Sequence, residues 1–259
     1  MEIWNYLLVI LVAFGASMLT FFSGFGLGTM LTPVFILFFP PEIAVAATAI
    51  VHFLNNMFKL VLVGKHAVKN IVLGFGLPAV AGAYVGASLL GWLANLDLGD
   101  LVQLFGSFET SALNITLGAL IISFSLLELL PAFKRLEFEK KWLIPGGIIS
   151  GLFGGISGHQ GALRSAFLIK FPLTKEQFVA SGIVIACLVD TIRIGTYSAT
   201  FDFSTIADSY VLLISATLAA FSGALLGKRM MKKVTIDSIQ NLVAILMTVI
   251  GALLLLGVI

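Results

Sequence analysis

Long apolar segments constrain the folding of this chain more than any other feature of its sequence. A helix that crosses the hydrocarbon core of a bilayer needs about 20 predominantly apolar residues. Stretches of that kind run over residues 3–39, 42–63, 71–94, 110–130, 143–171, 175–197, 208–227 and 239–259. Hydrophobic residues make up 59% of the 259 residues and charged residues only 11%, against about 25% charged residues in soluble domains. The sequence therefore predicts an all-α integral membrane protein.

The charges and the cysteine content exclude several classes of function. A formal net charge of +2 gives no electrostatic basis for a nucleic-acid partner. Cys187 is the single cysteine, so the sequence offers no pair for a disulfide and no cysteine-ligated zinc site. The three histidines lack the spacing of metal ligands, and we expect neither a metal nor a cofactor. The lipid bilayer is the partner that the composition indicates.

Two of the apolar stretches, 3–39 and 143–171, are too long for a single crossing. Each contains a glycine-rich break, at residues 23–28 and 154–161 respectively. Such a break fits either a kink in a long tilted helix or the tip of a hairpin that returns to its starting side. The distribution of loop cations separates these alternatives for the second stretch.

Lys and Arg residues in short loops favour the cytoplasmic side of a membrane. The loop cations are Lys65, Lys69, Lys134, Arg135, Lys140, Lys141, Lys170, Lys175, Lys228, Arg229, Lys232 and Lys233. A single crossing of 143–171 divides these twelve residues six to six, whereas a hairpin places all twelve on one side. We therefore predict that 143–171 is re-entrant from the cytoplasm. No cation precedes 3–39, so a hairpin is inferred there by analogy, and a full crossing followed by a half-helix stays open.

The two halves of the chain carry the same order of elements, a broken apolar stretch followed by three helices. Residues 47–51 (ATAIV) echo residues 180–184 (ASGIV) at a shift of about 133 residues. The predicted organisation is a first membrane repeat at 1–130, a cytoplasmic linker at 131–142 and a second membrane repeat at 143–259. The sequence does not fix the oligomeric state, and a homodimer stays among the options.

The third helix of each half contains a GxxxG pair, Gly82/Gly86 and Gly223/Gly227. These pairs favour close helix packing in lipid. With the orientations predicted above, the first half enters the membrane from outside and the second from inside. The sequence therefore predicts an inverted-topology repeat, which is typical of secondary transporters.

The two breaks are the candidate binding site. If both are hairpin tips, each delivers a helix N-terminus to mid-membrane depth, and two positive helix-dipole ends converge in the manner that holds anions. Irregular backbone at that depth requires burial in protein or a cavity, so a cavity is expected there. The alternative is that the glycines only permit tight helix packing. The candidate anion-binding residues are Gly26, Gly28, Thr29, Thr48, His52, Asn55, Ser157, His159, Gln160, Gly161, Arg164 and Ser181.

Several ionisable residues lie within the apolar stretches. Arg164 follows the second break far from either interface, so we expect it to face a cavity and an anion, with an ion pair to Asp190 as the alternative. Asp190 and Arg193 share a helix face, which predicts either an internal ion pair or a role in gating or proton coupling. For Lys59 and Arg193, each about one turn from a helix end, we expect side chains that snorkel to the interface.

With these features the chain resembles the TauE/SafE sulfite exporter family over nearly its full length. The first motif stands at residues 24–33 (GFGLGTMLTP), followed by Pro40-Pro41 and Ala46-Ala47-Thr48, and the second at 155–164 (GISGHQGALR), followed by Pro172 and Ala180-Ser181. Leu27 and His159-Gln160 interrupt the glycine-rich run typical of the family. The resemblance implies a multi-pass transporter of the bacterial inner membrane that exports sulfite or sulfonates, a class that includes sulfoacetate.

Other functions stay open at this stage. The helix N-termini and polar side chains at the two breaks favour an anion. They suit phosphate, carboxylate or nitrate as well as sulfur oxyanions. A passive anion channel would use the same electrostatics. An intramembrane serine protease is a weaker alternative, based on Ser157 within a GxSG sequence, because His159 is poorly placed two residues later to serve as its base. We therefore expect a transporter and not an enzyme.

Overall fold

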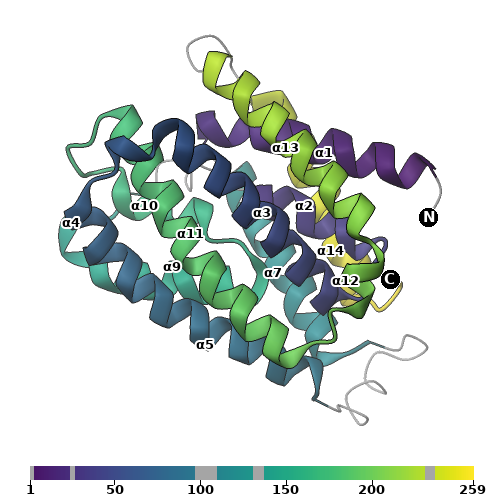
Figure 1. Ribbon diagram of the computed structural model, residues 1–259. Helices are drawn as coiled ribbons and strands as arrows, with labels where there is room; N and C mark the ends of the chain where they lie inside the picture. Colours follow the sequence, from purple (N-terminus) through teal and green to yellow (C-terminus); the bar gives the residue numbers. More distant parts are fainter. Residues whose placement is uncertain (1–2, 24–26, 97–109, 131–136, 231–236) are drawn as a thin grey trace.

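The computed structural model describes residues 3–23, 27–96, 110–130, 137–230 and 237–259, and these residues form helices without a β-strand among them (Figure 1). The helices of the first half are α1 (Ile3–Ser23), α2 (Leu27–Ile36), α3 (Pro41–Val63), α4 (Lys69–Ile71), α5 (Leu77–Ala94) and α7 (Ala112–Leu129). Those of the second half are α9 (Leu143–Ser157), α10 (Gly161–Leu168), α11 (Lys175–Thr200), α12 (Ser204–Asp208), α13 (Tyr210–Met230) and α14 (Asp237–Leu255). Short 3₁₀ turns at Gly64–His66 and Lys140–Trp142 and a π-turn at Val72–Gly76 complete the described elements.

Four helical segments are long and apolar enough to cross a membrane, Pro41–His66, Lys69–Ala94, Lys175–Thr200 and Tyr210–Arg229. The prediction of an all-α membrane protein is therefore confirmed. The stretches predicted at 110–130 and 239–259 also form helices, α7 and α14, although their described apolar parts are shorter.

Local sequence explains where the long helices begin. Pro41 occupies the first turn of α3, where its missing N–H leaves no hydrogen bond unmade. Thr174 caps α11 through a capping box, because its hydroxyl accepts from Gln177 N while the Gln177 side chain accepts from Thr174 N. Ser111 caps α7 by accepting from Asn114 N.

The two overlong stretches are each broken into two helices, as predicted. The first divides into α1 and α2, and we call their connection the first break; its residues 24–26, including the candidate Gly26, lie outside the described residues. The second divides into α9 and α10, and we call residues 158–160 the second break.

Helix packing is reciprocal between the two halves. The third helix of each half packs against the first helix of the other, α5 against α9 and α13 against α1 (Figure 1). Among the other long helices, α3 packs against α11 and α7 against α14.

The GxxxG glycines lie at these contacts. A Cβ on Gly82 or Gly86 would clash with carbonyl oxygens of α9, and one on Gly223 would clash with the Phe14 carbonyl of α1. Gly227 is similar, since a Cβ there would lie 2.6 Å from the Met18 carbonyl oxygen. The predicted close helix packing is therefore confirmed.

Candidate functional site

The start of α2, which follows the first break, meets the second break inside the protein. A Cβ on Gly28, in the first turn of α2, would lie 3.3 Å from the carbonyl oxygen of Gly158 in the second break. Gly158 ends α9 with a φ of 83°, in the left-handed region that glycine adopts without the strain of a side chain. We call the contact between Gly28 and Gly158 the junction.

Side chains from α2, α3 and α11 surround the junction. Thr48 of α3 places its methyl carbon 3.9 Å from the Cβ position of Gly28, and its buried hydroxyl finds no hydrogen-bond partner within the described part of the chain. Arg193 Nη1 of α11 lies 3.1 Å from the Cβ position of Gly158. Thr32 donates to the Gly28 carbonyl at 2.9 Å, and Thr29 is buried in the same turn of α2.

A buried hydrogen-bonded triad links α3 to α11. His52 Nδ1 lies 2.7 Å from Asp190 Oδ2, and Arg193 Nε donates to Asp190 Oδ1 at 2.9 Å. Arg193 Nη1 continues to the Gly154 carbonyl at 3.4 Å. The predicted Asp190–Arg193 ion pair is thus confirmed, with His52 as its third member. Arg193 is fully buried, so the expectation that it snorkels to the interface is wrong.

Polar neighbours of this triad were missed by the sequence reasoning. Asn56 Nδ2 lies within hydrogen-bond distance of the His52 ring, at 3.1 Å from Nδ1 and 3.2 Å from Nε2. Tyr197 donates its hydroxyl to the Gly155 carbonyl. Both residues stand four positions after a member of the triad, the spacing that places side chains on one helix face, and this spacing was the available signal.

A second buried polar group forms between α1 and α3. Asn55 contacts Ser17 of α1, and with its amide oriented to satisfy its neighbours its oxygen accepts from Lys59 Nζ at 3.0 Å. Lys59 is 1% exposed, so the snorkelling expected for it is wrong as well. The candidate Asn55 thus serves contacts to α1 and Lys59 rather than the junction.

The second break holds Ser157 and His159 in a tight turn. Ser157 donates its hydroxyl to the Phe153 carbonyl at 3.1 Å. His159 Nδ1 lies 3.1 Å from the Ser157 carbonyl and 3.0 Å from its hydroxyl, and the ring stacks on Phe124 of α7 at 5.1 Å. Since a carbonyl only accepts, Nδ1 carries the proton in this contact. It therefore does not act as a base for Ser157, which weakens the serine-protease alternative.

Three polar side chains that follow this turn have unsatisfied atoms. In the described part of the chain, hydrogen-bond partners are lacking for His159 Nε2, for both amide atoms of Gln160 and for Arg164 Nη1. Gly161 begins α10 directly after His159 and Gln160, and Arg164 lies in the first turn of α10. Buried polar atoms are almost always hydrogen-bonded, so such a set is suited to binding a polar ligand.

Arg164 packs against the N-terminal half of α11, and Ser181 belongs to that half. The two side chains make different contacts. The Arg164 guanidinium packs on Gly182, where a Cβ would lie 3.2 Å from its Nε. Both oxygens of Asp190 are taken by His52 and Arg193, so the alternative pairing of Arg164 with Asp190 is not the arrangement observed. Ser181 accepts from Val68 N at 2.9 Å, which uses its hydroxyl to hold the turn before α4.

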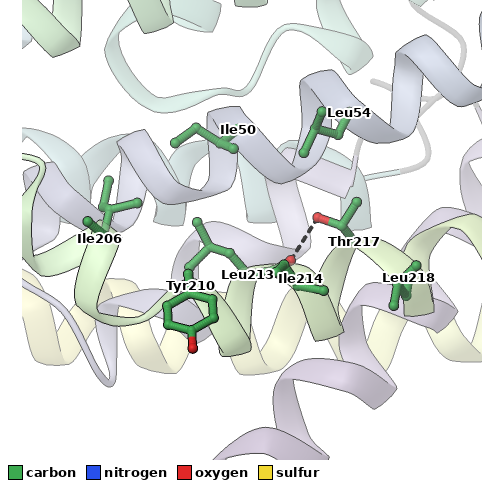
Figure 2. Close-up of a pocket in the computed structure, with 9 residues that line it drawn as sticks. Ile50, Leu54, Ile206, Tyr210, Leu213, Ile214, Thr217 and Leu218 are labelled. Carbon is green, nitrogen blue, oxygen red and sulfur yellow. Dashed lines mark hydrogen bonds between the residues drawn. The ribbon is translucent and has the colours of Figure 1, made fainter.

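A cavity of about 330 Å³ lies away from the junction, between α3, α12 and α13 (Figure 2). Figure 2 shows that it is lined by Ile50, Leu54, Ile206, Tyr210, Leu213, Ile214, Thr217 and Leu218. Thr217 donates its hydroxyl to Leu213 O at 2.7 Å, so this lining suits apolar groups rather than an anion. This cavity is not the one expected at the breaks, because none of its lining residues belongs to either break. At the junction itself the two backbones are in contact.

Comparison with known proteins identifies the family. The family described as Sulfite exporter TauE/SafE matches residues 9–254, nearly the whole chain. No curated protein and no solved structure matched it. With its apolar helices and glycine-rich breaks, the chain belongs to the TauE/SafE sulfite exporter family.

Proposed function

We propose that this protein is a secondary transporter that exports a small sulfur oxyanion, sulfite or an organosulfonate such as sulfoacetate, across the bacterial inner membrane by alternating access. The chain is a multi-pass membrane protein of a transporter family. The sulfur oxyanion and the export direction follow the description of that family.

An inverted repeat underlies the proposed mechanism. At a shift of about 133 residues, α2 corresponds to α10, α3 to α11 and α5 to α13. The reciprocal packing of α5 on α9 and α13 on α1 supports a two-fold relation between the halves. The proposed repeats are 1–130 and 143–259, joined by a cytoplasmic linker at 131–142, with the second break at the tip of a re-entrant hairpin. In such folds one half rocks against the other around a central site.

The junction is the single observation that carries the binding site. It brings the N-terminal turn of α2 against the second break, with the Thr48 hydroxyl and the Arg193 guanidinium beside it. Thr48 Oγ1 and Arg193 Nη2 are buried and lack partners among the described residues. Sulfite and sulfonates present oxygens that accept from hydroxyls and guanidinium groups. The unsatisfied atoms therefore supply donors to a bound oxyanion.

The balance of charge supports an anion over a cation. Arg164 packs on α11 and Arg193 belongs to it, whereas Asp190 is the one buried carboxylate among the side chains that the structure describes. A buried charge without a counter-charge is costly in a membrane. An anion near the second break compensates the second guanidinium, and we assign that charge to Arg164.

The contact at the junction fits a closed state of a carrier. A Cβ position on Gly28 only 3.3 Å from a backbone oxygen leaves no space there for an oxyanion. An anion therefore enters only if the halves separate at the junction. That requirement is the structural basis for proposing alternating access rather than a permanently open channel.

Flux of radiolabelled sulfite in proteoliposomes tests the function. We expect saturable flux, counter-exchange, and competition by sulfoacetate or thiosulfate but not by phosphate or nitrate. Arg164→Ala should weaken anion affinity about tenfold, since hydrogen bonds to charged groups contribute about 1.5–3 kcal/mol. Arg229→Ala, at an exposed position of α13, is the matched control and should leave affinity unchanged.

Two results would contradict the proposal. Flux that never saturates and that every anion inhibits would indicate a channel. Unchanged affinity in folded Arg164→Ala protein would remove Arg164 from the site.

A further inference from the structure

We propose that His52 binds a proton when an anion occupies the junction, so that the protein moves proton and anion together. This inference rests on the proposed anion transport. It adds that the anion moves together with a proton. It assigns the triad of His52, Asp190 and Arg193 a role in coupling proton and anion movement, beyond holding α3 against α11.

The hydrogen bonds define the protonation state of His52 in the closed conformation. Asp190 Oδ2, 2.7 Å from Nδ1, accepts a hydrogen bond, so Nδ1 carries a proton. Asn56 Nδ2 lies 3.1 Å from Nδ1 and 3.2 Å from Nε2. Because Nδ1 already carries a hydrogen, Nε2 is the ring nitrogen whose lone pair can accept from this amide. The ring is therefore neutral, and both of its nitrogens are satisfied. The triad as a whole, with one carboxylate and one guanidinium, then has no net charge.

Protonation of His52 changes this arrangement in a defined way. A hydrogen on Nε2 would face the Asn56 amide nitrogen, so the amide must turn and offer its oxygen instead. The Asp190 carboxylate would then face two cations, His52 and Arg193, and the triad would carry a net charge of +1. Because Nη1 of Arg193 lies 3.1 Å from the Cβ position of Gly158, the added charge acts next to the junction.

This geometry makes proton and anion binding mutually favourable. A positive triad attracts an oxyanion to the junction more strongly than a neutral one. By thermodynamic linkage, a bound oxyanion favours proton binding at His52 to the same extent. The two ligands therefore bind together and leave together.

The other charged groups around His52 do not replace this role. Asp190 and Arg193 of α11 and Lys59 of α3 are the charged groups that act on His52 among the described residues. The neighbouring α2 has no titratable side chain in its sequence. Of the remaining titratable residues of α3 and of the elements packed on it, Cys187 and Tyr197 are buried within α11. The others stand at or beyond the ends of their helices or on an exposed face, and they are Glu42, Lys65, His66, Tyr84, Glu128, Lys175, Glu176, Asp208, Tyr210, Lys228 and Arg229.

Proton movement during sulfonate transport tests the inference directly. Proteoliposomes that enclose a pH-sensitive dye receive a gradient of sulfoacetate, whose acidic groups stay ionised at about pH 6 to 8, so that any transported proton is carried by the protein. Wild-type protein should move about one proton per anion, as expected for linkage through one histidine. His66→Gln, at an exposed histidine, is the matched control and should behave as wild type.

His52→Gln should abolish proton movement and make the remaining anion flux independent of pH. Anion flux without proton movement in wild type, or proton movement in His52→Gln equal to wild type, would overturn the inference while leaving the proposed function intact. Absence of anion flux in folded wild-type protein would overturn both.

Asn56→Ala provides a second variant in case His52→Gln does not fold. Loss of the donor to Nε2 removes the contact that opposes protonation. Proton movement should therefore persist, and the pH at which anion flux falls to half should rise. An unchanged pH profile in this variant would contradict the assignment of Nε2 as the proton acceptor.

Discussion

Each overlong apolar stretch contains a glycine-rich break, but the residues after the first break differ in chemistry from those of the second break. The described residues after the first break, at the start of α2, offer Thr29 and Thr32, and the Thr32 hydroxyl is used on the Gly28 carbonyl. The second break contributes His159 and Gln160, and Arg164 follows one turn later. The described side chains with unsatisfied atoms thus concentrate at the second break and its neighbours on α3 and α11.

The difference teaches that the two halves share glycine-rich breaks in sequence, whereas the charged and amide side chains are found only at the second break and just after it. A glycine-rich break is present in the sequence of both halves. Charge inside a membrane is costly, so one set of charged residues at a shared site serves both halves. We therefore expect substitutions at the second break to alter the affinity for the anion. Substitutions at the first break should alter how the two halves come together at the junction.

The largest expected effect comes from Arg193→Leu, which removes the buried guanidinium that pairs with Asp190 in the second half of the chain. The substitution leaves Asp190 buried without its guanidinium, and loss of one partner from a buried pair costs about 3–5 kcal/mol. We expect a large drop in the melting temperature and loss of sulfite flux. Arg229→Leu, exposed on α13, should change neither.

A double variant separates stability from function at this position. Asp190→Asn together with Arg193→Leu removes both charges and should regain part of the lost stability without regaining flux. Wild-type flux in the double variant would show that the ion pair has no part in transport.

Alanine at the two junction glycines gives an intermediate effect and compares the breaks directly. Gly158→Ala forces a side chain into the left-handed region, at a cost of about 1–2 kcal/mol, and places a Cβ 3.1 Å from Arg193 Nη1. Gly28→Ala has no such strain but presses on the Gly158 carbonyl. Both should slow flux, and Gly158→Ala should lower the melting temperature more.

Gly195→Ala is the matched control for these glycines, because the space around a Cβ there is open among the described atoms. It should keep wild-type flux and stability. Equal stability of Gly158→Ala and Gly195→Ala would contradict the conformation assigned to the second break.

The smallest expected effects come from the matched hydroxyls Thr48 and Ser181. Thr48→Val removes a hydroxyl without a described partner and should weaken sulfite affinity about fivefold, roughly 1 kcal/mol, with stability maintained. Ser181→Ala removes the acceptor of Val68 N and should lower stability by about 1 kcal/mol, with affinity maintained. Equilibrium binding and thermal unfolding of both variants check this contrast, and the reverse pattern would refute the assignment.

Much of the fold followed from apolar patterning. The stretch predicted at 42–63 forms α3, that at 175–197 forms α11, and that at 208–227 forms α13. The second break was located because its glycines interrupt a stretch longer than one crossing. Helix length and glycine position are local properties, and a single sequence records them.

The partners within the site were harder to predict. The His52–Asp190 contact joins residues 138 positions apart, and a single sequence contains no information on that distance. The prediction that the Arg193 and Lys59 side chains snorkel to the membrane interface was wrong. It was based only on the distance of each residue from the end of its helix. Neighbouring helices enclose both side chains, and only tertiary packing determines which face of a helix is enclosed.

The most direct test of the account is the accessibility of position 48 during transport. A Thr48→Cys variant in a Cys187→Ser background carries one thiol, at the junction. The account predicts that a membrane-impermeant maleimide modifies this thiol when applied from either side of the membrane, and that saturating sulfoacetate slows the reaction from both sides. Modification from one side only, or a rate that sulfoacetate leaves unchanged, would contradict an alternating-access anion site between the two breaks.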